Sequence, residues 1–537
     1  MTEPTIDGLL ADADLTRFAE LRGLIARLAG EQSLRGARRD GKAIGARGLD
    51  GIPVTGVTSD SRAVRPGMIF VAIPGLHVDG HDFVAAAAAA DAAAVVVDHP
   101  LPDVALPQLV VGDSRHALAT AAAWWYDDPS HELAVVGITG TDGKTTTSFL
   151  AVAALEAAGI RTGMTGTAAT RIGGVQEANA AHATTPEAPD LQRALRAMLV
   201  AGDAAAVIET TSHGLALARV DEIAFDVAIL TNLTHEHLEL HGTWEAYRDA
   251  KLRLFERLAQ RVVKPRPWPA TGIVNADDPS AGAFIGVAQE AGARVLTYGT
   301  DPAADVRATR VEEDQHRLRI VYDAPSGGAT VDLRLVGRFN VHNALAVVAL
   351  GEAVGLDPAV VREGLATVLV VPGRMERVER GQPFGVIVDF AHSPVALQTV
   401  LDLLAPLAAS RDGGLIAVFG SAGERDTAKR PLMGRIAGER ARIVVVTDED
   451  PRGEDREAIL DAIARGAEAA GKRRDHDLLV IADRRSAIDA AVERARPGDI
   501  VLLAGKGHEQ AIIGPDGPVP WNEREEAEAA LRRAGYG

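Results

Sequence analysis

The sequence predicts an α/β fold of three consecutive domains, with a phosphate-loop ATPase domain in the centre and a Rossmann-like domain at the C-terminus. The chain has 537 residues, which at roughly 150 residues per domain corresponds to three or four domains. From residue 55 onward, short apolar segments of strand length alternate with helical patterns, which is typical of α/β layers. A glycine-rich loop joins a strand to a helix at 140–144, as phosphate loops do.

Composition restricts the classes of function. Hydrophobic residues make up 47% and charged residues 24%, an ordinary globular mixture. The net charge of −18 disfavours a surface for nucleic acid or anionic membranes, because both need a positive field. Cysteine is absent, which excludes disulfides, thiolate metal sites and cysteine nucleophiles. The N-terminus lacks a signal-peptide pattern, and the apolar run 84–97 is too short to span a bilayer. We expect a cytoplasmic protein without a membrane segment.

The N-terminal domain is expected over 1–131. Its first fifty residues predict an extension with one helix over 14–29, followed by a mobile Arg/Gly-rich connection. Apolar strands at 68–73, 93–98 and 108–112 then alternate with helices at 85–94 and 119–126. Asp128-Pro129 separates this domain from the next strand.

The central domain is expected over 132–370 and the C-terminal domain over 371–537. The central strands are predicted at 133–139, 206–210, 226–231 and 272–275, and segment 304–336 predicts a small antiparallel sheet. After Val371-Pro372-Gly373, five apolar strands each precede a helical pattern, at 384–389, 415–420, 442–447, 478–482 and 500–505. This alternation predicts a doubly wound sheet, in which ligands bind beyond the carboxyl ends of the strands.

The loop GITGTDGKTTT carries the strongest functional signal. Gly137, Gly140 and Gly143 would let the backbone N–H groups and the helix N-terminus surround a phosphate. Lys144 would neutralise the β- and γ-phosphates, and the Thr145 hydroxyl would hold Mg²⁺. The spacing departs from the strict pattern, and Asp142 places a carboxylate beside the loop. The alternative interpretation is a glycine-rich strand-to-helix turn without a ligand.

Two further strand ends carry candidate metal ligands. Glu209 ends one strand, and the segment after the next strand contains Asn232 and a run of histidines and glutamates: His235, Glu236, His237, Glu239 and His241. Carboxylates and imidazoles at strand ends suit Mg²⁺ and substrate phosphates. The alternative is a solvated His/Glu loop, since no zinc-type spacing is present.

One lysine lies where the helical pattern expects an apolar side chain. Trp244, Tyr247, Lys251, Leu254 and Leu258 share one helical face at spacings of 3, 4, 3 and 4. A buried lysine commonly has a lowered pKa or is chemically modified. The alternative is a lysine whose stem packs while its amine reaches solvent.

Polar clusters follow four strands of the C-terminal domain and predict one rim of a site. They comprise the loop with Gly420, Gly423, Arg425, Asp426, Lys429 and Arg430; Asp389 with His392; the segment Asp448, Glu449, Asp450, Pro451 and Arg452; and the segment Gly505, Lys506, Gly507, His508 and Glu509. This mixture of cations and carboxylates suits a ligand that carries both a carboxylate and an amine.

These segments, in this order, resemble the Mur ligase family over about residues 52–530. The similarity is greatest to members that add a diamino acid to UDP-N-acetylmuramoyl-L-alanyl-D-glutamate in peptidoglycan biosynthesis, a pathway of cell-wall formation and cell division. The resemblance implies a UDP-sugar domain, an ATP domain and an amino-acid domain. It also implies that ATP phosphorylates the terminal carboxylate of the substrate, and that an amine then attacks the acyl phosphate.

The motifs carry over residue by residue. Three motifs, namely TSDSR with its neighbours, ATTPE, and ETTSHGL, match segments that bind the UDP-muramoyl-peptide. They imply contacts from Ser59, Ser61, Leu76, His77, Val78, Thr184, Thr185, Pro186, Thr211 and Arg219. The phosphate loop, VNADD and PGRME imply contacts to ATP from Gly137, Thr139, Gly140, Thr141, Asp142, Gly143, Lys144, Thr145, Thr146, Asn275 and Arg374. The C-terminal motifs imply contacts to the amino acid from Arg425, Glu449, Asp450, Pro451, Arg452, Gly505 and Glu509.

The resemblance also implies the catalytic centre. Lys144, Glu209, His237 and Lys251 would be catalytic, and two Mg²⁺ ions would be held by Thr145, Glu209, His237 and Lys251. Lys251 matches the lysine that family members carbamylate with CO₂, which accounts for its place on an apolar helix face. Small-molecule substrates and a monomer are expected.

The resemblance leaves the added amino acid open. Family members that add diaminopimelate read Asp-Asn-Pro-Arg where this chain reads Glu449-Asp450-Pro451-Arg452. Arg452 favours the distal carboxylate of meso-diaminopimelate, whereas Asp450 would suit the bare amine of lysine or ornithine. Other Mur ligases, a folylpolyglutamate-type synthetase and a phosphate-loop NTPase switch are the alternative functions.

Overall fold

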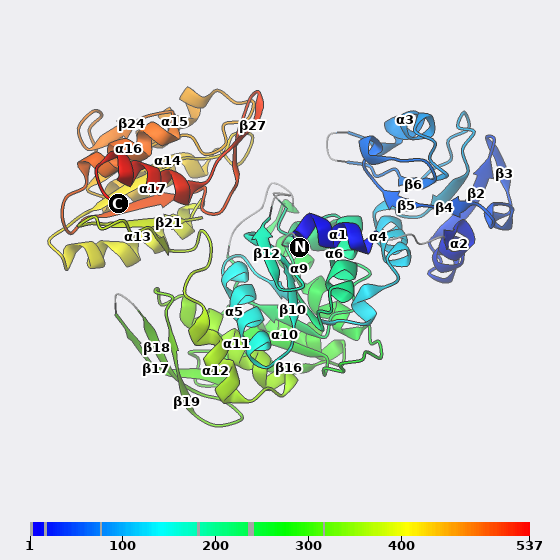
Figure 1. Ribbon diagram of the computed structural model, residues 1–537, viewed down its shortest axis with the longest axis horizontal. Helices are drawn as coiled ribbons and strands as arrows, with labels where there is room; N and C mark the ends of the chain where they lie inside the picture. The colour runs from blue at the N-terminus through cyan, green and yellow to red at the C-terminus, as the bar shows by residue number, and fades with distance from the viewer. Residues whose placement is uncertain (1–3, 15–18, 76–77, 180–182, 235–240, 315–316) are drawn as a thin grey trace. The chain divides into compact units, whose positions relative to one another are not determined.

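Three main sheets organise the chain, and each is built from the apolar segments that lie between helical patterns (Figure 1). The computed structural model describes residues 4–14, 19–75, 78–179, 183–234, 241–314 and 317–537. The chain divides into two compact units, one of Met1–Arg310, Val321–Thr330 and His342–Leu365, the other of Val311–Ile320, Val331–Val341 and Ala366–Gly537. No helix among the described residues combines the length and apolarity needed to cross a bilayer.

The N-terminal sheet has six strands in the order β3-β2-β8-β7-β6-β5. Their bounds are β2 (Leu34–Arg39), β3 (Lys42–Ile44), β5 (Gly56–Thr58), β6 (Met68–Val71), β7 (Ala94–Val97) and β8 (Gln108–Val111). Alternate residues of each strand point to opposite faces. Ile69 and Val96 therefore pack with α2 (Leu21–Gly30) and α4 (Ser114–Trp125), whereas Phe70 and Val95 pack with α3 (Val84–Ala89).

The first fifty residues differ from the prediction. Two helices, α1 (Ile6–Ala13) and α2, replace the single helix expected over 14–29. The Arg/Gly-rich stretch expected to be a mobile connection forms the hairpin β2–β3. Asp40 and Gly41, with φ of 48° and 71°, make its two-residue turn, and Asp-Gly is a common sequence for such turns. Helix α1 packs on the central sheet, where Ile6 is buried in its core.

The central sheet has eleven strands in the order β12-β11-β10-β13-β9-β14-β15-β16-β17-β18-β19. Their bounds are β9 (Ala134–Thr139), β10 (Thr162–Thr165), β11 (Ala169–Ile172), β12 (Val175–Ala178), β13 (Ala205–Glu209), β14 (Val227–Leu230), β15 (Thr271–Asn275), β16 (Arg294–Gly299), β17 (Val306–Glu313), β18 (Leu318–Asp323) and β19 (Ala329–Leu333). The predicted separate sheet over 304–336 is instead the edge of this sheet, because β17 pairs in parallel with β16.

The order of the parallel strands indicates at which edge of the central sheet a ligand would bind. The chain leaves β9 for β10, returns to β13 on one side of β9, and then adds β14 on the other side. Ligands in such sheets bind where the strand order reverses. The loop after β9 lies at that point and leads into α5 (Lys144–Ala157). The other helices are α6 (Ala188–Val200), α7 (Ser212–Ala216), α9 (Trp244–Glu256), α10 (Ala281–Glu290), α11 (Asn340–Val354) and α12 (Pro358–Thr367).

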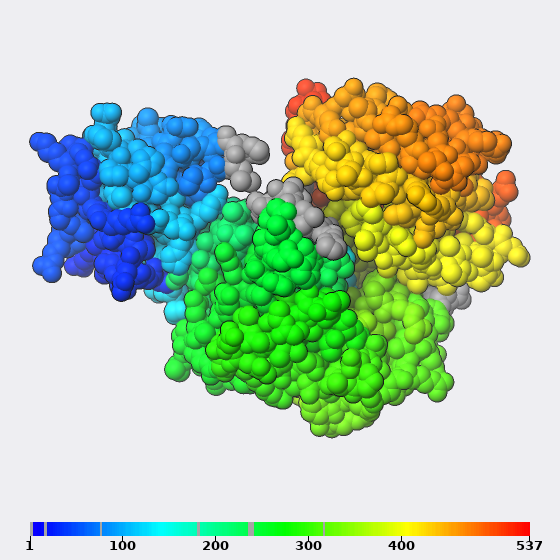
Figure 2. Space-filling view, turned by 180° about the vertical axis from the view of Figure 1, so that it is seen from behind, coloured from blue at the N-terminus to red at the C-terminus, as the bar shows by residue number. Residues whose placement is uncertain are grey.

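The C-terminal sheet is doubly wound, as predicted, in the order β20-β21-β25-β22-β23-β24. Its strands are β20 (Glu376–Arg377), β21 (Gly385–Asp389), β22 (Leu415–Phe419), β23 (Ile443–Val446), β24 (Leu478–Val480) and β25 (Ile500–Ala504). One face packs on α13 (Pro394–Ala409), α14 (Lys429–Arg440) and α15 (Arg456–Ala469), the other on α16 (Arg484–Arg494) and α17 (Glu523–Arg533). A hairpin of β26 (Ala511–Gly514) and β27 (Gly517–Pro520) precedes α17. Figure 2 shows the outer surface of the chain, coloured from the N-terminus to the C-terminus.

Candidate active site

The loop between β9 and α5 needs glycine at two positions. Gly140 has φ of 146° and Gly143 has φ of 84°, conformations that other residues rarely adopt. A Cβ on Gly140 would lie 1.9 Å from the Thr231 hydroxyl oxygen, and one on Gly143 would lie 2.5 Å from Asn343 Oδ1. The end of β14 and the start of α11 therefore contact the loop too closely for any side chain at these two positions, which restricts its backbone conformation.

Two residues of the motif differ from what was expected. Gly137 lies inside β9, not in the loop, and a Cβ there would come within 2.7 Å of Leu254 and 2.8 Å of Phe225. Its role is close packing of α9 on the sheet. Asp142 is exposed, and it contributes to the loop through its backbone, whose N–H donates to Asn232 Oδ1 over 2.9 Å. The electrostatic conflict expected from the Asp142 carboxylate is reduced because this side chain faces solvent.

Two lysines from different helices converge on one carbonyl of the loop. Lys144, the first residue of α5, donates through Nζ to the carbonyl oxygens of Gly140 and Thr141 over 2.9 and 2.8 Å. Lys251 of α9 donates to the same Gly140 oxygen over 2.8 Å and is 1% exposed. Its Nζ also lies 4.6 Å from the centre of the Tyr247 ring. The predicted burial of Lys251 is confirmed, and both lysine amines lie at the phosphate loop.

The candidate magnesium ligands of β13 and α5 meet. Glu209, the last residue of β13, is fully buried, and its Oε2 accepts from the hydroxyls of Thr145 over 3.0 Å and Thr167 over 2.8 Å. The Thr167 backbone N–H donates to Glu209 Oε1 over 3.0 Å. A buried carboxylate beside a hydroxyl is a donor set that suits a hard cation. His237 lies outside the described residues, together with His235, Glu236 and Glu239.

The segments expected to hold the muramoyl-peptide gather around the same strand end. The Thr185 hydroxyl donates to the Glu209 backbone oxygen over 2.9 Å and lies 3.0 Å from the Thr211 hydroxyl. Arg219 donates to the Thr185 carbonyl over 2.8 Å and pairs with Glu187 over 2.5 Å. Segments 184–187, 209–211 and 219 therefore form one cluster of hydroxyls around an arginine.

The remaining contacts expected in the first unit lie on α5, at the end of β15, and after β5 and β6, and some of them are outside the described residues. Thr146, in the first turn of α5, is 5% exposed. Asn275, at the end of β15, donates to the Thr231 carbonyl over 2.7 Å, so its amide also holds β14 in place. Ser59 and Ser61 follow β5 and are half-buried, and Val78 is exposed, whereas Leu76 and His77 lie outside the described residues.

In the C-terminal unit, the expected amino-acid rim contains a buried cluster of charges. Lys506, fully buried after β25, pairs with Asp450 Oδ1 over 2.7 Å and with Glu509 Oε2 over 2.5 Å. The Ile513 N–H also donates to Asp450 Oδ1 over 2.9 Å. Burial raises the pKa of Glu509 above its ordinary value. Glu449 is 6% exposed, and its Oε2 has no hydrogen-bond partner among the described residues.

Other residues of the rim surround this cluster. Gly505 has φ of 102°, and a Cβ on it would lie 3.2 Å from Glu449 Oε2, so glycine leaves room for that carboxylate. Arg452 has φ of 55° and its Nε has no partner in the part of the chain that the structure describes. Pro451 is buried and Arg425 is exposed. The Arg374 guanidinium, expected to contact ATP, stacks over the Phe390 ring at 4.7 Å.

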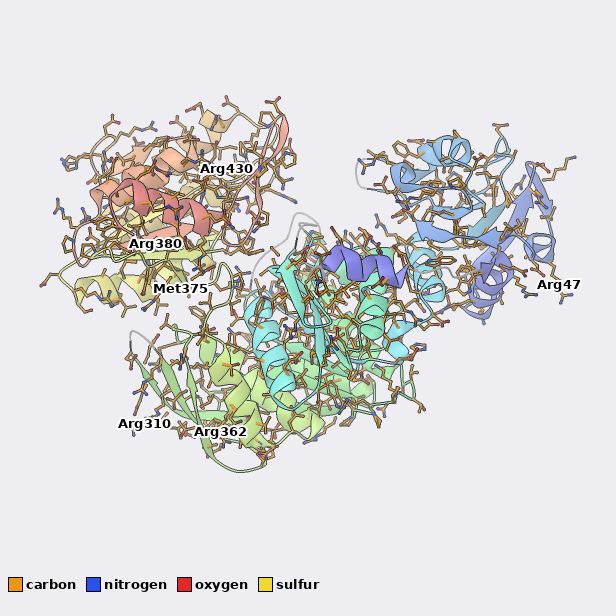
Figure 3. All side chains as sticks on the ribbon, viewed as in Figure 1. Arg47, Arg310, Arg362, Met375, Arg380 and Arg430 are labelled. Carbon is orange, nitrogen blue, oxygen red and sulfur yellow. The ribbon has the colours of Figure 1, made fainter. Side chains whose placement is uncertain are left out.

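Two buried arginines support the rim: Arg430 belongs to the loop predicted from the sequence, whereas Arg484 was not assigned a role. Arg484, the first residue of α16, donates to the carbonyls of Asp448 and Ala504 and pairs with Glu523 over 2.6 Å. It joins the ends of β23 and β25 to α17. The sequence pattern did indicate that Arg484 is buried, because it shares one helical face with the apolar residues Ala487 and Ile488. Arg430, labelled in Figure 3, binds the Glu454 carboxylate through two nitrogens, over 2.6 and 2.8 Å.

Comparisons with known proteins agree with this arrangement. Residues 53–126 match the catalytic domain of the Mur ligase family, residues 138–351 the Mur ligase middle domain, and residues 373–507 the glutamate ligase domain of Mur ligases. A UDP-N-acetylmuramyl-tripeptide synthetase of Roseiflexus sp. (strain RS-1) is 49% identical over 90% of this chain and 96% of that protein. The chain belongs to the Mur ligase family.

Further relatives of this Mur ligase carry a more specific name. A UDP-N-acetylmuramoyl-L-alanyl-D-glutamate–2,6-diaminopimelate ligase of Geobacter metallireducens is 41% identical over 90% of this chain and 94% of its own length. A solved structure of a ligase with that name is similar with a TM-score of 0.61 and 31% identity, covering 90% of this chain and 96% of the other. A folylpolyglutamate synthase of Mycobacterium tuberculosis shares the fold, with a TM-score of 0.60 at 19% identity. The three-domain Mur ligase architecture is therefore confirmed, and the chain is an ATP-dependent amide ligase of peptidoglycan synthesis.

Proposed function

We propose that this Mur ligase adds meso-diaminopimelate to UDP-N-acetylmuramoyl-L-alanyl-D-glutamate through an acyl phosphate, with domains over 1–131, 132–370 and 371–537. Glu209 carries the proposal. Its side chain contacts Thr145 of the phosphate loop, and its backbone oxygen accepts from Thr185 of the segment assigned to the muramoyl-peptide. One buried residue thus joins the place for ATP to the place for the acceptor carboxylate, which is the proximity that phosphoryl transfer needs.

In the proposed mechanism, the loop N–H groups and Lys144 hold the β- and γ-phosphates of ATP. The terminal carboxylate of the substrate attacks the γ-phosphorus, and ADP leaves. The amine then attacks the acyl carbon, loses a proton, and expels inorganic phosphate. Thr145 and Glu209 would hold Mg²⁺, which would neutralise charge on the transferring group. Arg219 and the hydroxyls of Thr185 and Thr211 would orient the acceptor.

We further propose that Lys251 carries a carbamate and completes the metal site with His237. The ammonium first loses one proton; the free amine then attacks CO₂ and releases a second proton, so the side chain changes from a cation to a bidentate anion. The burial of Lys251 beside the phosphate loop supports this assignment, because its amine is held in place and kept away from bulk water next to the proposed metal ligands. Lys251→Ala is expected to lose activity, and wild-type protein prepared without CO₂ is expected to regain activity with bicarbonate. Full activity of Lys251→Ala, with no gain from bicarbonate, would contradict the carbamate.

The choice of diaminopimelate depends on how Asp450 is paired. A free Asp450 would favour the bare amine of lysine or ornithine, but Lys506 and the Ile513 N–H already occupy its Oδ1. Arg452, whose Nε has no partner among the residues described, then offers a guanidinium that can bind a distal carboxylate. Relatives named 2,6-diaminopimelate ligases support the same choice.

Amine selectivity tests this proposal. We expect kcat/KM for meso-diaminopimelate to exceed that for lysine and ornithine by at least about 100-fold, because a site with a cation for the distal carboxylate discriminates against amines that lack this carboxylate. Arg452→Ala should remove most of that preference, whereas the exposed control Arg465→Ala should keep it. A preference for lysine or ornithine in the wild-type enzyme would overturn the assignment of diaminopimelate and leave the ligase chemistry intact.

A further inference from the structure

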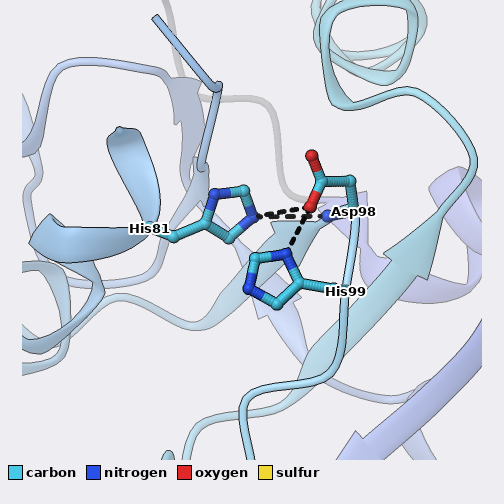
Figure 4. Close-up of side chains that lie close together, drawn as sticks. All are labelled: His81, Asp98 and His99. Atoms are coloured by element: carbon cyan, nitrogen blue, oxygen red, sulfur yellow. Dashed lines mark hydrogen bonds and ion pairs between the residues drawn. The ribbon is translucent and has the colours of Figure 1, made fainter. Parts of the chain in front are cut away.

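A second cluster of metal-ligating side chains lies in the N-terminal sheet, outside the residues assigned to the ligase reaction. His81 lies in the short 3₁₀ helix η3 (Gly80–Phe83), and Asp98 and His99 directly follow β7 (Figure 4). His81 Nε2 lies 3.3 Å from Asp98 Oδ1, and His99 Nδ1 lies 2.5 Å from the same oxygen. The two imidazole rings stack with their centres 4.4 Å apart. One ligand atom from each residue therefore lies within 4.8 Å of the other two.

The orientation of His81 is set by a neighbouring carboxylate. Its Nδ1 lies 2.6 Å from Asp79 Oδ1, which also accepts from the His81 backbone N–H over 3.0 Å. A carboxylate at Nδ1 holds the proton there and leaves the lone pair of Nε2 directed at Asp98, as in many zinc sites. The His81 side chain is only 6% exposed, so packing fixes the ring. The Asp98 N–H donates to Nε2 over 3.4 Å, a long and therefore weak hydrogen bond that a bound cation would replace.

We propose that His81, Asp98 and His99 bind a divalent cation of the zinc class. Two imidazoles and a carboxylate are a frequent ligand set of zinc sites that keep a fourth position for water. The 3.3 Å between Nε2 and Oδ1 matches the edge of a tetrahedron with bonds of about 2.0–2.1 Å. His99 is 55% exposed and can turn about its side-chain torsions to lengthen its 2.5 Å contact. Mg²⁺ is disfavoured because it prefers oxygen ligands in octahedral geometry.

The other cluster of this kind among the described residues, Glu31, His116 and Glu222, fits a cation less well. It has a single imidazole, and His116 Nδ1 already pairs with Asp221 over 3.1 Å. The cluster of His81, Asp98 and His99 would thus be the stronger site, and its cation would cross-link η3 to the end of β7. That cross-link stabilises the N-terminal sheet whether or not the chain is a diaminopimelate ligase.

Calorimetric titration of the metal-free full chain with Zn²⁺ tests this site. The calorimeter cell contains excess Mg²⁺, so that sites built of oxygen ligands are already occupied by Mg²⁺ and do not take up Zn²⁺. Asp98→Asn and His99→Ala are compared with the wild type, and His476→Ala serves as the control, because this histidine is 68% exposed in the C-terminal unit. We expect one more zinc equivalent in the wild type and the control than in the two variants, or an affinity at least about tenfold higher. The variants should also lose the tetrahedral absorption of bound Co²⁺.

Equal zinc stoichiometry, affinity and cobalt spectra in the wild type, Asp98→Asn and His99→Ala would overturn the site. Asp98→Asn keeps the size and shape of the side chain, so it still tests the site even if His99→Ala disturbs the loop. Circular dichroism of each variant checks that the chain is folded. Because the titration measures no turnover, its outcome is independent of the proposed amide-forming reaction.

Discussion

Replacing Arg484 should destabilise the C-terminal domain more than any exposed substitution on the same two helices. Arg484 and Glu523 are both fully buried and link α16 to α17. Arg484→Met would leave the Glu523 carboxylate without its cation and would remove the donors to the Asp448 and Ala504 carbonyls. Removing one partner of a buried ion pair costs about 3–5 kcal/mol, because an uncompensated charge remains.

The chain offers matched controls for this effect. Arg533 and Asp489 join the same two helices through an exposed pair, so Arg533→Met should cost only about 0–1 kcal/mol. The double variant Arg484→Met/Glu523→Gln should be more stable than Arg484→Met alone, because it removes both charges of this pair and leaves neither without its partner. Urea unfolding gives the free-energy differences, and hydrogen exchange of peptides covering β23 and β25 assigns them to this domain. A loss below about 1 kcal/mol for Arg484→Met, or a double variant less stable than the single one, would refute the reasoning.

Three other predictions concern the phosphate loop, the metal ligand and acid stability. Glu209→Gln should raise the Mg²⁺ concentration needed for half-maximal activity by at least about tenfold, as a magnesium titration of phosphate release would show. Gly140→Ala should abolish binding of a fluorescent ATP analogue, whereas Gly282→Ala, which meets no atom within 4 Å, should bind it normally. The hydrogen bond from Arg430 lowers the pKa of Glu454 from 4.5 to about 2. Because the pKa of Glu454 is lower in the folded state than in the unfolded state, this stabilisation is complete above pH 4.5 and is lost as the pH falls toward 2. The urea midpoint of the wild type should therefore fall more over this pH range than that of Glu454→Gln.

Much of the site was predictable because its residues follow neighbouring parallel strands. Thr145 and Glu209 are 64 residues apart, yet they meet because β9 and β13 pair in register and end at the same edge. Lys251 was predicted to be buried because its neighbours at helical spacing are apolar, and the structure confirms the burial. Helical periodicity carries the information about Lys251, and the position of Glu209 at the end of a predicted strand marked it as a candidate ligand, whereas the pairing of β9 with β13 became known only from the structure.

Other features depended on contacts that local patterns do not specify. Lys506 and Asp450 are 56 residues apart, and the sequence does not show that one buried charge neutralises the other. The β2–β3 hairpin was missed because arginines obscured its Asp-Gly turn, and the sheet that accepts it lies about seventy residues further along the chain, at β8. The position of α1 on the central sheet likewise follows from burial of Ile6, which periodicity alone does not assign to a partner.

Phosphate release from the complete reaction tests the central claim most directly. The chain is mixed with Mg²⁺ and ATP, and UDP-N-acetylmuramoyl-L-alanyl-D-glutamate and meso-diaminopimelate are added singly and together. The proposed mechanism predicts sustained phosphate release only when both are present, with one phosphate released for each amide formed. Equal turnover of ATP without either substrate would contradict the ligase mechanism and would instead indicate a phosphate-loop NTPase.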